Sequence, residues 1–273
     1  LRPAEATSDW LSRVETLKQG WGEDVFDTAL EGLSVIEAPG PAEEARAAAL
    51  ALREILETPG ARAVLVTPDR ALARRVVVEM DRFSVQLDDS AGEPLSDTPP
   101  GAFLMRIAQA AGDPGSALAF IALTASPLFA LGEQRARLKP DLGALERAGL
   151  RGRRPGYDFE ALYAAVTDAA GADERAAARW GDIVRRTAAA FEPLMALTGA
   201  APARAWAEAL ATTAETLAAT DAVPGADRLW AGDAGEAAAG LIGDFLREAE
   251  ALPDLTLADF TAALLEMARA RMV

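Results

Sequence analysis

The chain has 273 residues, a formal net charge of −15 and 51% hydrophobic residues, enough to bury the core of one large or two ordinary domains. It contains neither Cys nor His, which excludes disulfides, thiolate metal sites and every Ser-His-Asp triad. No run of ~18 apolar residues and no signal-peptide core occurs, so we expect a cytoplasmic protein without membrane contact. Because the chain begins with Leu1 and not Met, we expect a fragment of a longer protein.

The first 132 residues alternate between strand-like and helical patterns, after a weak helical signal over residues 1–33. The predicted strands are 33–38, 62–66 and 83–87, and the predicted helices are 41–58, 68–82, 102–111 and 114–125. Strands that alternate with helices in this way favour a small parallel sheet with right-handed crossovers. We therefore predict an α/β domain over residues 1–132, with helices flanking the sheet.

The remaining residues, 133–273, carry helical patterns and no convincing strand. The predicted helices are 141–148, 158–170, 173–198, 202–220, 234–251 and 256–271. Asp158 and Asp233 are typical N-cap residues, and Thr256 with Asp259 fits a capping box. The predicted fold class is thus α/β plus all-α, with a separate helical domain over residues 133–273.

The turn at residues 67–70 joins the second predicted strand to a helix. Thr67 is typical of an N-cap, Pro68 of the first helical position, and Asp69 complements the positive end of the helix dipole. The alternative is a phosphate held at this helix N-terminus and clamped by Arg70. There is no Gly-rich loop and no Lys-Ser/Thr pair, and Asp69 would repel a phosphate. We therefore favour the capped helix start.

A polar loop at residues 88–101 begins with the two carboxylates Asp88 and Asp89. Such a pair could bind a metal ion or act in acid–base chemistry, but hard cations need several oxygen ligands and no third acid stands at a supporting spacing. We predict no metal site here. The Pro and Gly content indicates a surface loop that contacts a partner or a nucleic-acid strand.

Residues 133–154 form a basic island with a local net charge of +4, in which the bases are Arg135, Arg137, Lys139, Arg147, Arg151, Arg153 and Arg154. Tyr157 follows directly, and Arg side chains with an aromatic ring are suited to holding phosphates and stacking bases. Arg151, Arg153, Arg154 and Tyr157 are therefore candidate DNA-binding residues. The alternative is a solvated loop whose arginines pair with the acidic helices that follow.

Two stretches carry a resemblance to a known family: residues 65–76, LVTPDRALARRV, and residues 88–95, DDSAGEPL. With the element order and the Glu-Glu-Ala-Arg helix start at 43–46, they resemble domain 2A of UvrD/RecB-type superfamily 1 helicases. The wording is most similar to AddB, the second subunit of bacterial AddAB helicase-nucleases, in its alphaproteobacterial form. Residues 133–273 would then correspond to the helical 2B insertion, which they match in layout.

The resemblance implies a RecA-like 2A portion and a non-catalytic role in a subunit that processes DNA double-strand breaks. The implied partners are DNA ends and an AddA-like helicase-nuclease subunit, and ATP with Mg²⁺ is expected for the complete complex. Thr67, Asp69 and Arg70 would lie at a nucleotide-facing motif. Active relatives carry an Arg where Thr67 stands, so the motif is degenerate, and Arg70 is only a doubtful substitute and a further candidate for DNA contact. We predict no catalytic residue and no bound cofactor.

Two other hypotheses remain open at this point. One is a stand-alone nucleotide-binding α/β enzyme with a helical lid, which needs a phosphate site that the sequence does not reveal. The other is a protein-interaction module that uses the acidic helices of residues 201–273, which hold twelve acids and five bases.

Overall fold

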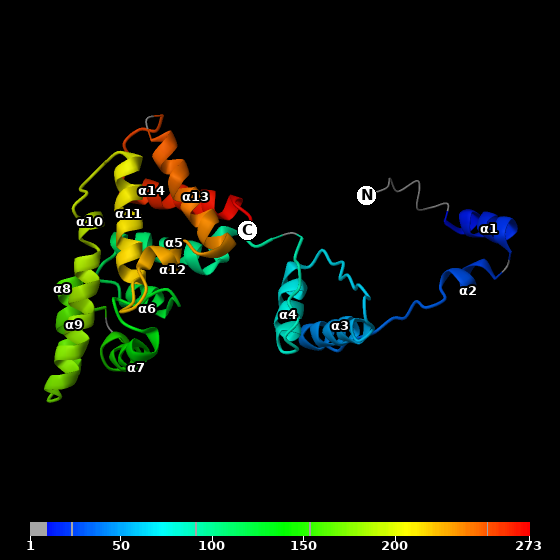
Figure 1. The fold of residues 1–273 in the computed structure, drawn as a ribbon, viewed down its shortest axis with the longest axis horizontal. Helices are drawn as coiled ribbons and strands as arrows, with labels where there is room; N and C mark the ends of the chain where they lie inside the picture. The colour runs from blue at the N-terminus through cyan, green and yellow to red at the C-terminus, as the bar shows by residue number, and fades with distance from the viewer. Residues whose placement is uncertain (1–9, 23, 91, 153, 250) are drawn as a thin grey trace. The chain divides into compact units, whose positions relative to one another are not determined.

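The computed structural model describes residues 10–273 apart from residues 23, 91, 153 and 250. It divides into two compact units, Leu1–Asp89 and Ser90–Val273 (Figure 1). The expected boundary between residues 132 and 133 therefore lies inside the second unit. Helices account for 66% of the residues.

The described residues of the first unit form the helices α1 (Trp10–Trp21), α2 (Val25–Ala29), α3 (Pro41–Leu56) and α4 (Arg70–Asp81). Helices α3 and α4 pack against each other because each places apolar side chains three or four residues apart on one face. The small core that results consists of Ala45, Ala49, Leu52, Leu72, Val76 and Met80.

The predicted parallel sheet is wrong, because the described residues of the chain contain no strand. Segments 33–38, 62–66 and 85–89 are non-helical, and no backbone hydrogen bond joins them to one another within the described residues. Strand propensity measures how well side chains fit a pleated, half-buried surface, and it does not identify the segment that supplies the hydrogen bonds. The RecA-like α/β fold class is therefore replaced by an all-helical one.

The alternating pattern of these segments nevertheless indicates which side chains contact α3 and α4. Val85 and Leu87 are half-buried against the small core, whereas Gln86 between them is exposed. Val64 and Val66 point the other way and are 80% and 89% exposed. Segments 62–66 and 85–89 thus place one face on the helix pair and leave the other face uncovered within the described residues, whereas Leu33, Val35 and Ile36 are exposed.

The second unit is a helical body built around α5 (Pro99–Gly112), which is buried along most of its length. Helix α5 packs against α6 (Ala117–Ala125), α11 (Ala203–Ala218), α13 (Gly232–Glu248) and α14 (Leu257–Ala270). A helix that is apolar on nearly all sides is stable only inside a body of this kind. The other elements are η2 (Leu95–Asp97), α7 (Arg135–Leu145), the π-helical turn η3 (Glu146–Leu150), α8 (Phe159–Ala169), α9 (Glu174–Ala190), α10 (Glu192–Met195) and α12 (Gly225–Leu229).

Several predicted helix ends are confirmed and others are corrected. Asp158 caps α8, and Thr256 with Asp259 forms the predicted capping box of α14. Asp233 is not an N-cap and lies in the first turn of α13. The single helix expected over 173–198 is divided into α9 and α10, where Pro193 cannot donate to the preceding turn.

Within the described part of the chain, none of the helices is both long enough and apolar enough to cross a membrane.

Candidate functional site

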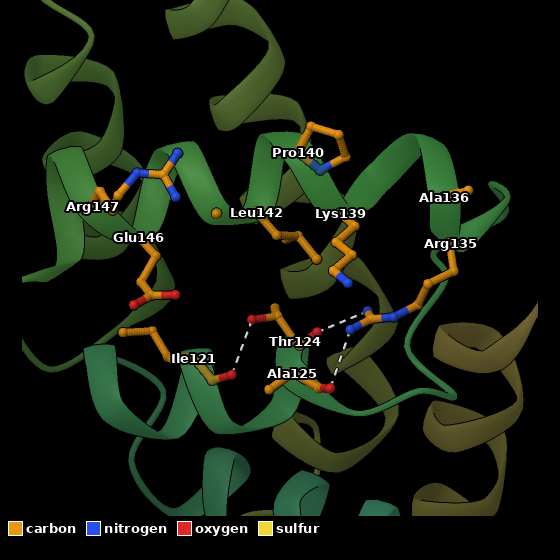
Figure 2. A pocket seen from close by; sticks show the side chains of 11 residues that line it. Ile121, Thr124, Ala125, Arg135, Ala136, Lys139, Pro140, Leu142, Glu146 and Arg147 are labelled. Carbon is orange, nitrogen blue, oxygen red and sulfur yellow. Dashed lines mark hydrogen bonds between the residues drawn. The ribbon is translucent and has the colours of Figure 1, made fainter. Parts of the chain in front are cut away.

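A groove of about 660 Å³ lies in the second unit between α6 and the consecutive elements α7 and η3. Figure 2 shows its two walls, with Ile121 and Ala125 on α6 facing Leu142 on α7. The lining also includes the cationic side chains of Arg135 and Lys139. Its volume falls within the range of about 300–1,000 Å³ that is common for ligand pockets.

The wall formed by α6 begins at a capped helix start. The Ser116 hydroxyl accepts a hydrogen bond from the Ala119 backbone N–H at 3.2 Å. Ile121, Thr124 and Ala125 share one face because they lie three or four residues apart. The last carbonyl groups of the helix carry partial negative charge and need donors, which a cation supplies well.

Arg135 is the donor at this helix end. Its guanidinium donates to the backbone carbonyls of Thr124 at 2.8 Å, Ala125 at 3.1 Å and Phe129 at 3.0 Å. Burial lowers the pKa of Arg135, and the positive charge of Arg228 lowers it further. Since its hydrogen-bond partners among the described residues are all carbonyls, no carboxylate compensates its charge.

The wall formed by α7 and η3 contributes two further cations, Lys139 and Arg147. Both are exposed, and no ion pair or side-chain hydrogen bond involves either of them within the described residues. Lys139 extends from α7 toward the α6 wall (Figure 2). Arg147 lies beside Gly143, where an added Cβ would come within 3.2 Å of the guanidinium.

Glu146 is the acidic side chain of the groove lining, and it points into the space above Ile121 (Figure 2). Both Nε and Nη2 of Arg151 donate to one of its carboxylate oxygens, at 3.1 and 2.9 Å. Arg151 therefore compensates Glu146, and the charges of Arg135, Lys139 and Arg147 are left over in the groove.

Arg154 and Tyr157, two of the predicted DNA-binding residues, stack on each other. The Arg154 guanidinium lies 4.6 Å from the centre of the Tyr157 ring, pairs with the Asp113 carboxylate and donates to the Gly156 carbonyl at 2.7 Å. Tyr157 is 82% exposed. The fourth predicted residue, Arg153, lies outside the described residues.

The cationic side chains of residues 135–154 are distributed along the length of α6. Arg135 contacts the C-terminal end of α6, whereas Arg154 contacts Asp113, which precedes its N-terminal end. The chain between them therefore runs antiparallel to α6. We define the cationic row as Arg135, Lys139, Arg147, Arg151 and Arg154.

An ionic network fixes the position of α7 and with it the groove wall. Glu133 accepts hydrogen bonds from Arg179 at 2.7 and 2.9 Å and also pairs with Arg186. Arg179 reaches Asp141 on α7 at 2.8 Å as well. The hydrogen bonds from Arg179 lower the pKa of Glu133 to about 2, against a smaller opposing effect of burial.

The predicted nucleotide-facing turn lies in the first unit, and its helix cap is a different residue from the one predicted. Asp69, and not Thr67, is the N-cap of α4, and its carboxylate accepts from the N–H groups of Ala71 at 2.8 Å and Leu72 at 3.2 Å. The Thr67 hydroxyl accepts from the Asp69 N–H at 3.0 Å. A phosphate at this helix end would have to displace a carboxylate that already occupies its donors.

Arg70, the proposed phosphate clamp, forms two hydrogen bonds with Asp89, at 3.0 and 2.9 Å. These bonds raise the pKa of Arg70 above its ordinary value. Asp88 and Asp89 do not belong to any group of three or more possible metal ligands within the described residues. The ion pair between Arg70 and Asp89 joins the turn at residues 67–70 to the start of the polar loop.

The sequence pointed to Arg151, Arg153, Arg154 and Tyr157 and not to the groove. Arg135 and Lys139 lie four residues apart and so share one face of α7, whereas Arg147 follows in the π-helical turn, which the sequence did not indicate. The apolar residues of α6 that complete the groove belong to a separate helix, and the sequence does not show that the two helices meet.

Comparisons of the chain with protein-family models, with curated proteins and with solved structures found no match. The likeness to AddB therefore remains a hypothesis that rests on the sequence stretches quoted above.

Proposed function

We propose that this chain is a non-catalytic binding part of a complex that processes DNA ends during double-strand break repair. Its second unit contacts the DNA backbone through the cationic row, and the chain docks onto an AddA-like helicase-nuclease subunit. ATP and Mg²⁺ act elsewhere in that complex. The observation that carries the DNA contact is the excess of positive charge along α6.

The charge balance of the groove supports a polyanionic partner. The positive charges of Arg135, Lys139 and Arg147 have no carboxylate partner among the described residues, although the whole chain has a net charge of −15. In an acidic protein, such a local excess makes one surface attractive to phosphates while the rest repels them. The DNA is therefore expected to bind over this row.

The assignment to DNA-end processing comes from the resemblance of residues 65–76 and 88–95 to AddB. The alternative of a nucleotide-binding enzyme loses support, because the α/β sheet on which it depends does not occur and the donors at the α4 N-terminus are occupied by Asp69. The alternative of a protein-interaction module differs from our proposal in one property: it requires no DNA.

The test measures binding of a fluorescent duplex with a single-stranded tail by anisotropy at low salt. The variant Lys139→Ala/Arg147→Ala removes two uncompensated cations, and Arg175→Ala/Arg269→Ala is the matched control because it removes two exposed cations elsewhere in the second unit. We expect micromolar binding by the wild type and the control and at least tenfold weaker binding by the groove variant. Equal weakening by both variants, or no binding by the wild type, would refute the DNA contact.

Docking onto the helicase-nuclease partner has its own test. The chain and a purified AddA-like subunit are mixed without DNA and analysed by size-exclusion chromatography with light scattering. A stable complex that forms without DNA supports the scaffold role. Two separate peaks at micromolar concentration would contradict it.

A further inference from the structure

The stacked pair of Arg154 and Tyr157 lies next to the start of α6. Gly115 and Gly156 allow the two backbones to touch, because a Cβ at Gly115 would lie 2.4 Å from the Gly156 carbonyl oxygen. Asp158, which directly follows Tyr157, caps α8 by accepting from the Ala161 N–H at 2.8 Å. A close backbone contact at Gly156 and the helix cap at Asp158 thus flank the exposed ring.

The Tyr157 side chain differs from Tyr163, the other tyrosine of the chain. Tyr163 packs against the core of the second unit, accepts a hydrogen bond from Arg185 and has that guanidinium 4.1 Å above its ring. Tyr157 also has a guanidinium beside its ring, but it is 82% exposed and does not belong to the hydrophobic core. An exposed ring gives a planar surface at which a further planar group can stack.

Arg154 stacks on the Tyr157 ring and is paired with Asp113, so the charge that attracts phosphates comes from the cations further along α6 that are unpaired among the described residues. The Arg154 guanidinium is oriented by the Asp113 carboxylate and the Gly156 carbonyl, so stacking on the ring costs little additional side-chain entropy. Bases of a duplex are stacked on each other and are not accessible to such a ring, whereas bases of a single strand are. Geometry and chemistry together favour a single strand over a duplex at this end of α6.

The distance along α6 sets the length of strand required. The helix has nine residues, which corresponds to about 13 Å between the Tyr157 loop and the carbonyl groups that Arg135 contacts. One strand of B-DNA advances about 3.4 Å per phosphate, so about four nucleotides of a stacked strand span this distance. The described residues that line the groove include no aromatic side chain, so only the nucleotide at Tyr157 is expected to stack on the protein.

We infer that the cationic row binds a short single-stranded nucleic acid, with one base stacked on Tyr157 and the phosphates that follow it lying along α6 toward Arg135. This inference rests on the proposed function and specifies its substrate. The protein makes no base-edge contact in this arrangement, so binding is independent of sequence. DNA and RNA share the chemistry that is recognised, and the proposed function selects DNA.

The experiment compares oligothymidines of two and ten nucleotides, a blunt duplex and oligouridine of ten nucleotides with the wild type, Tyr157→Ala, Tyr157→Phe and Tyr157→Leu. Loss of one base stack is expected to weaken binding of the ten-nucleotide strand by roughly tenfold in Tyr157→Ala and Tyr157→Leu. Tyr157→Phe keeps the ring and should bind as the wild type does. The blunt duplex should bind more weakly than the single strand and be unaffected by all three changes, and the dinucleotide should not bind.

A strand that carries 5-iodouridine at one position identifies the stacked residue directly, because ultraviolet light crosslinks this base to an aromatic ring in contact with it. The crosslinked peptide should contain Tyr157 and not Tyr163.

If Tyr157→Ala binds the single strand as the wild type does while the duplex binds through the row, this inference is refuted and the proposed function stands. If neither nucleic acid binds and an acidic peptide does, both are refuted. Stronger binding of oligouridine than of oligothymidine would refute the assignment to DNA.

Discussion

Replacing Glu133 by Gln is expected to loosen the attachment of α7 to α9 and to change the pH dependence of stability. Glu133 accepts hydrogen bonds from both Arg179 and Arg186, with which Asp182 also forms ion pairs, and the pKa of Glu133 is lowered from the ordinary 4.5 to about 2. A pKa difference of this size corresponds to about 3 kcal/mol of folding free energy when the carboxylate is ionised. Because its side chain is still 24% exposed, solvent screening reduces the expected value to about 1–2 kcal/mol.

The sign of the pH dependence follows from the direction of the pKa change. A carboxylate with a lowered folded-state pKa stabilises the protein above its unfolded-state pKa of about 4.5 and loses this contribution as the pH falls toward 2. The Gln side chain does not titrate. The difference in stability between wild type and Glu133→Gln should therefore be largest at neutral pH and decrease steadily below pH 4.5.

The assay is urea denaturation followed by circular dichroism at several pH values between 7 and 2.5, with Glu174→Gln as a control in the first turn of α9. The control changes one exposed carboxylate and has no hydrogen-bond or ion-pair partner among the described side chains. A stability difference between wild type and Glu133→Gln that stays constant over this pH range would refute the reasoning. So would a difference below about 0.3 kcal/mol at pH 7.

Three further predictions test the fold. Val66→Lys should change stability by less than about 0.5 kcal/mol in urea denaturation, because Val66 is 89% exposed, whereas Val76→Ala should cost the first unit about 2 kcal/mol because Val76 is fully buried. Thr256→Ala removes the capping box of α14 and should lower the free energy of unfolding by about 1 kcal/mol. Gly101→Ala should prevent the second unit from folding, as judged by lost near-ultraviolet circular dichroism, because a Cβ there would lie 1.8 Å from the Leu95 carbonyl oxygen. A large loss in Val66→Lys, or a folded Gly101→Ala, would contradict the packing described.

Helix starts were predictable from the sequence where the signal is local. The Thr256 capping box and the Asp158 cap involve residues three positions apart, and both occur as predicted. The cap of α4 was assigned to Thr67, although Asp69 provides it, because both residue types are favourable caps and only the backbone geometry distinguishes them.

The sheet could not be judged from the sequence, because pairing of strands depends on segments that are far apart in the chain. The alternation in residues 83–87 predicted a strand, which the described residues do not contain, although Val85 and Leu87 do pack against the core of α3 and α4. It gave no information on whether residues 62–66 would lie alongside, and they form no ladder. A half-buried extended segment and a strand have the same local pattern.

The positive charge of the candidate site could be predicted from the sequence, whereas the shape of the groove could not. The basic island was visible as an excess of Arg and Lys over residues 133–154, and Tyr157 was visible as the adjacent aromatic. The pairing of Arg151 with Glu146 and the exposure of Lys139 depend on the π-helical turn η3 and on the contact between α6 and α7. These features follow from tertiary packing.

The central claim is that the cations along α6 contact phosphates, and the salt dependence of DNA binding tests it most directly. The affinity of wild type and Lys139→Ala/Arg147→Ala for a tailed duplex is measured between 50 and 200 mM salt, and the logarithm of the binding constant is plotted against that of the salt concentration. Each lost phosphate contact reduces the slope by about one, so we predict a slope that is smaller by about two in the variant. An identical slope in both proteins would mean that these cations do not contact the DNA.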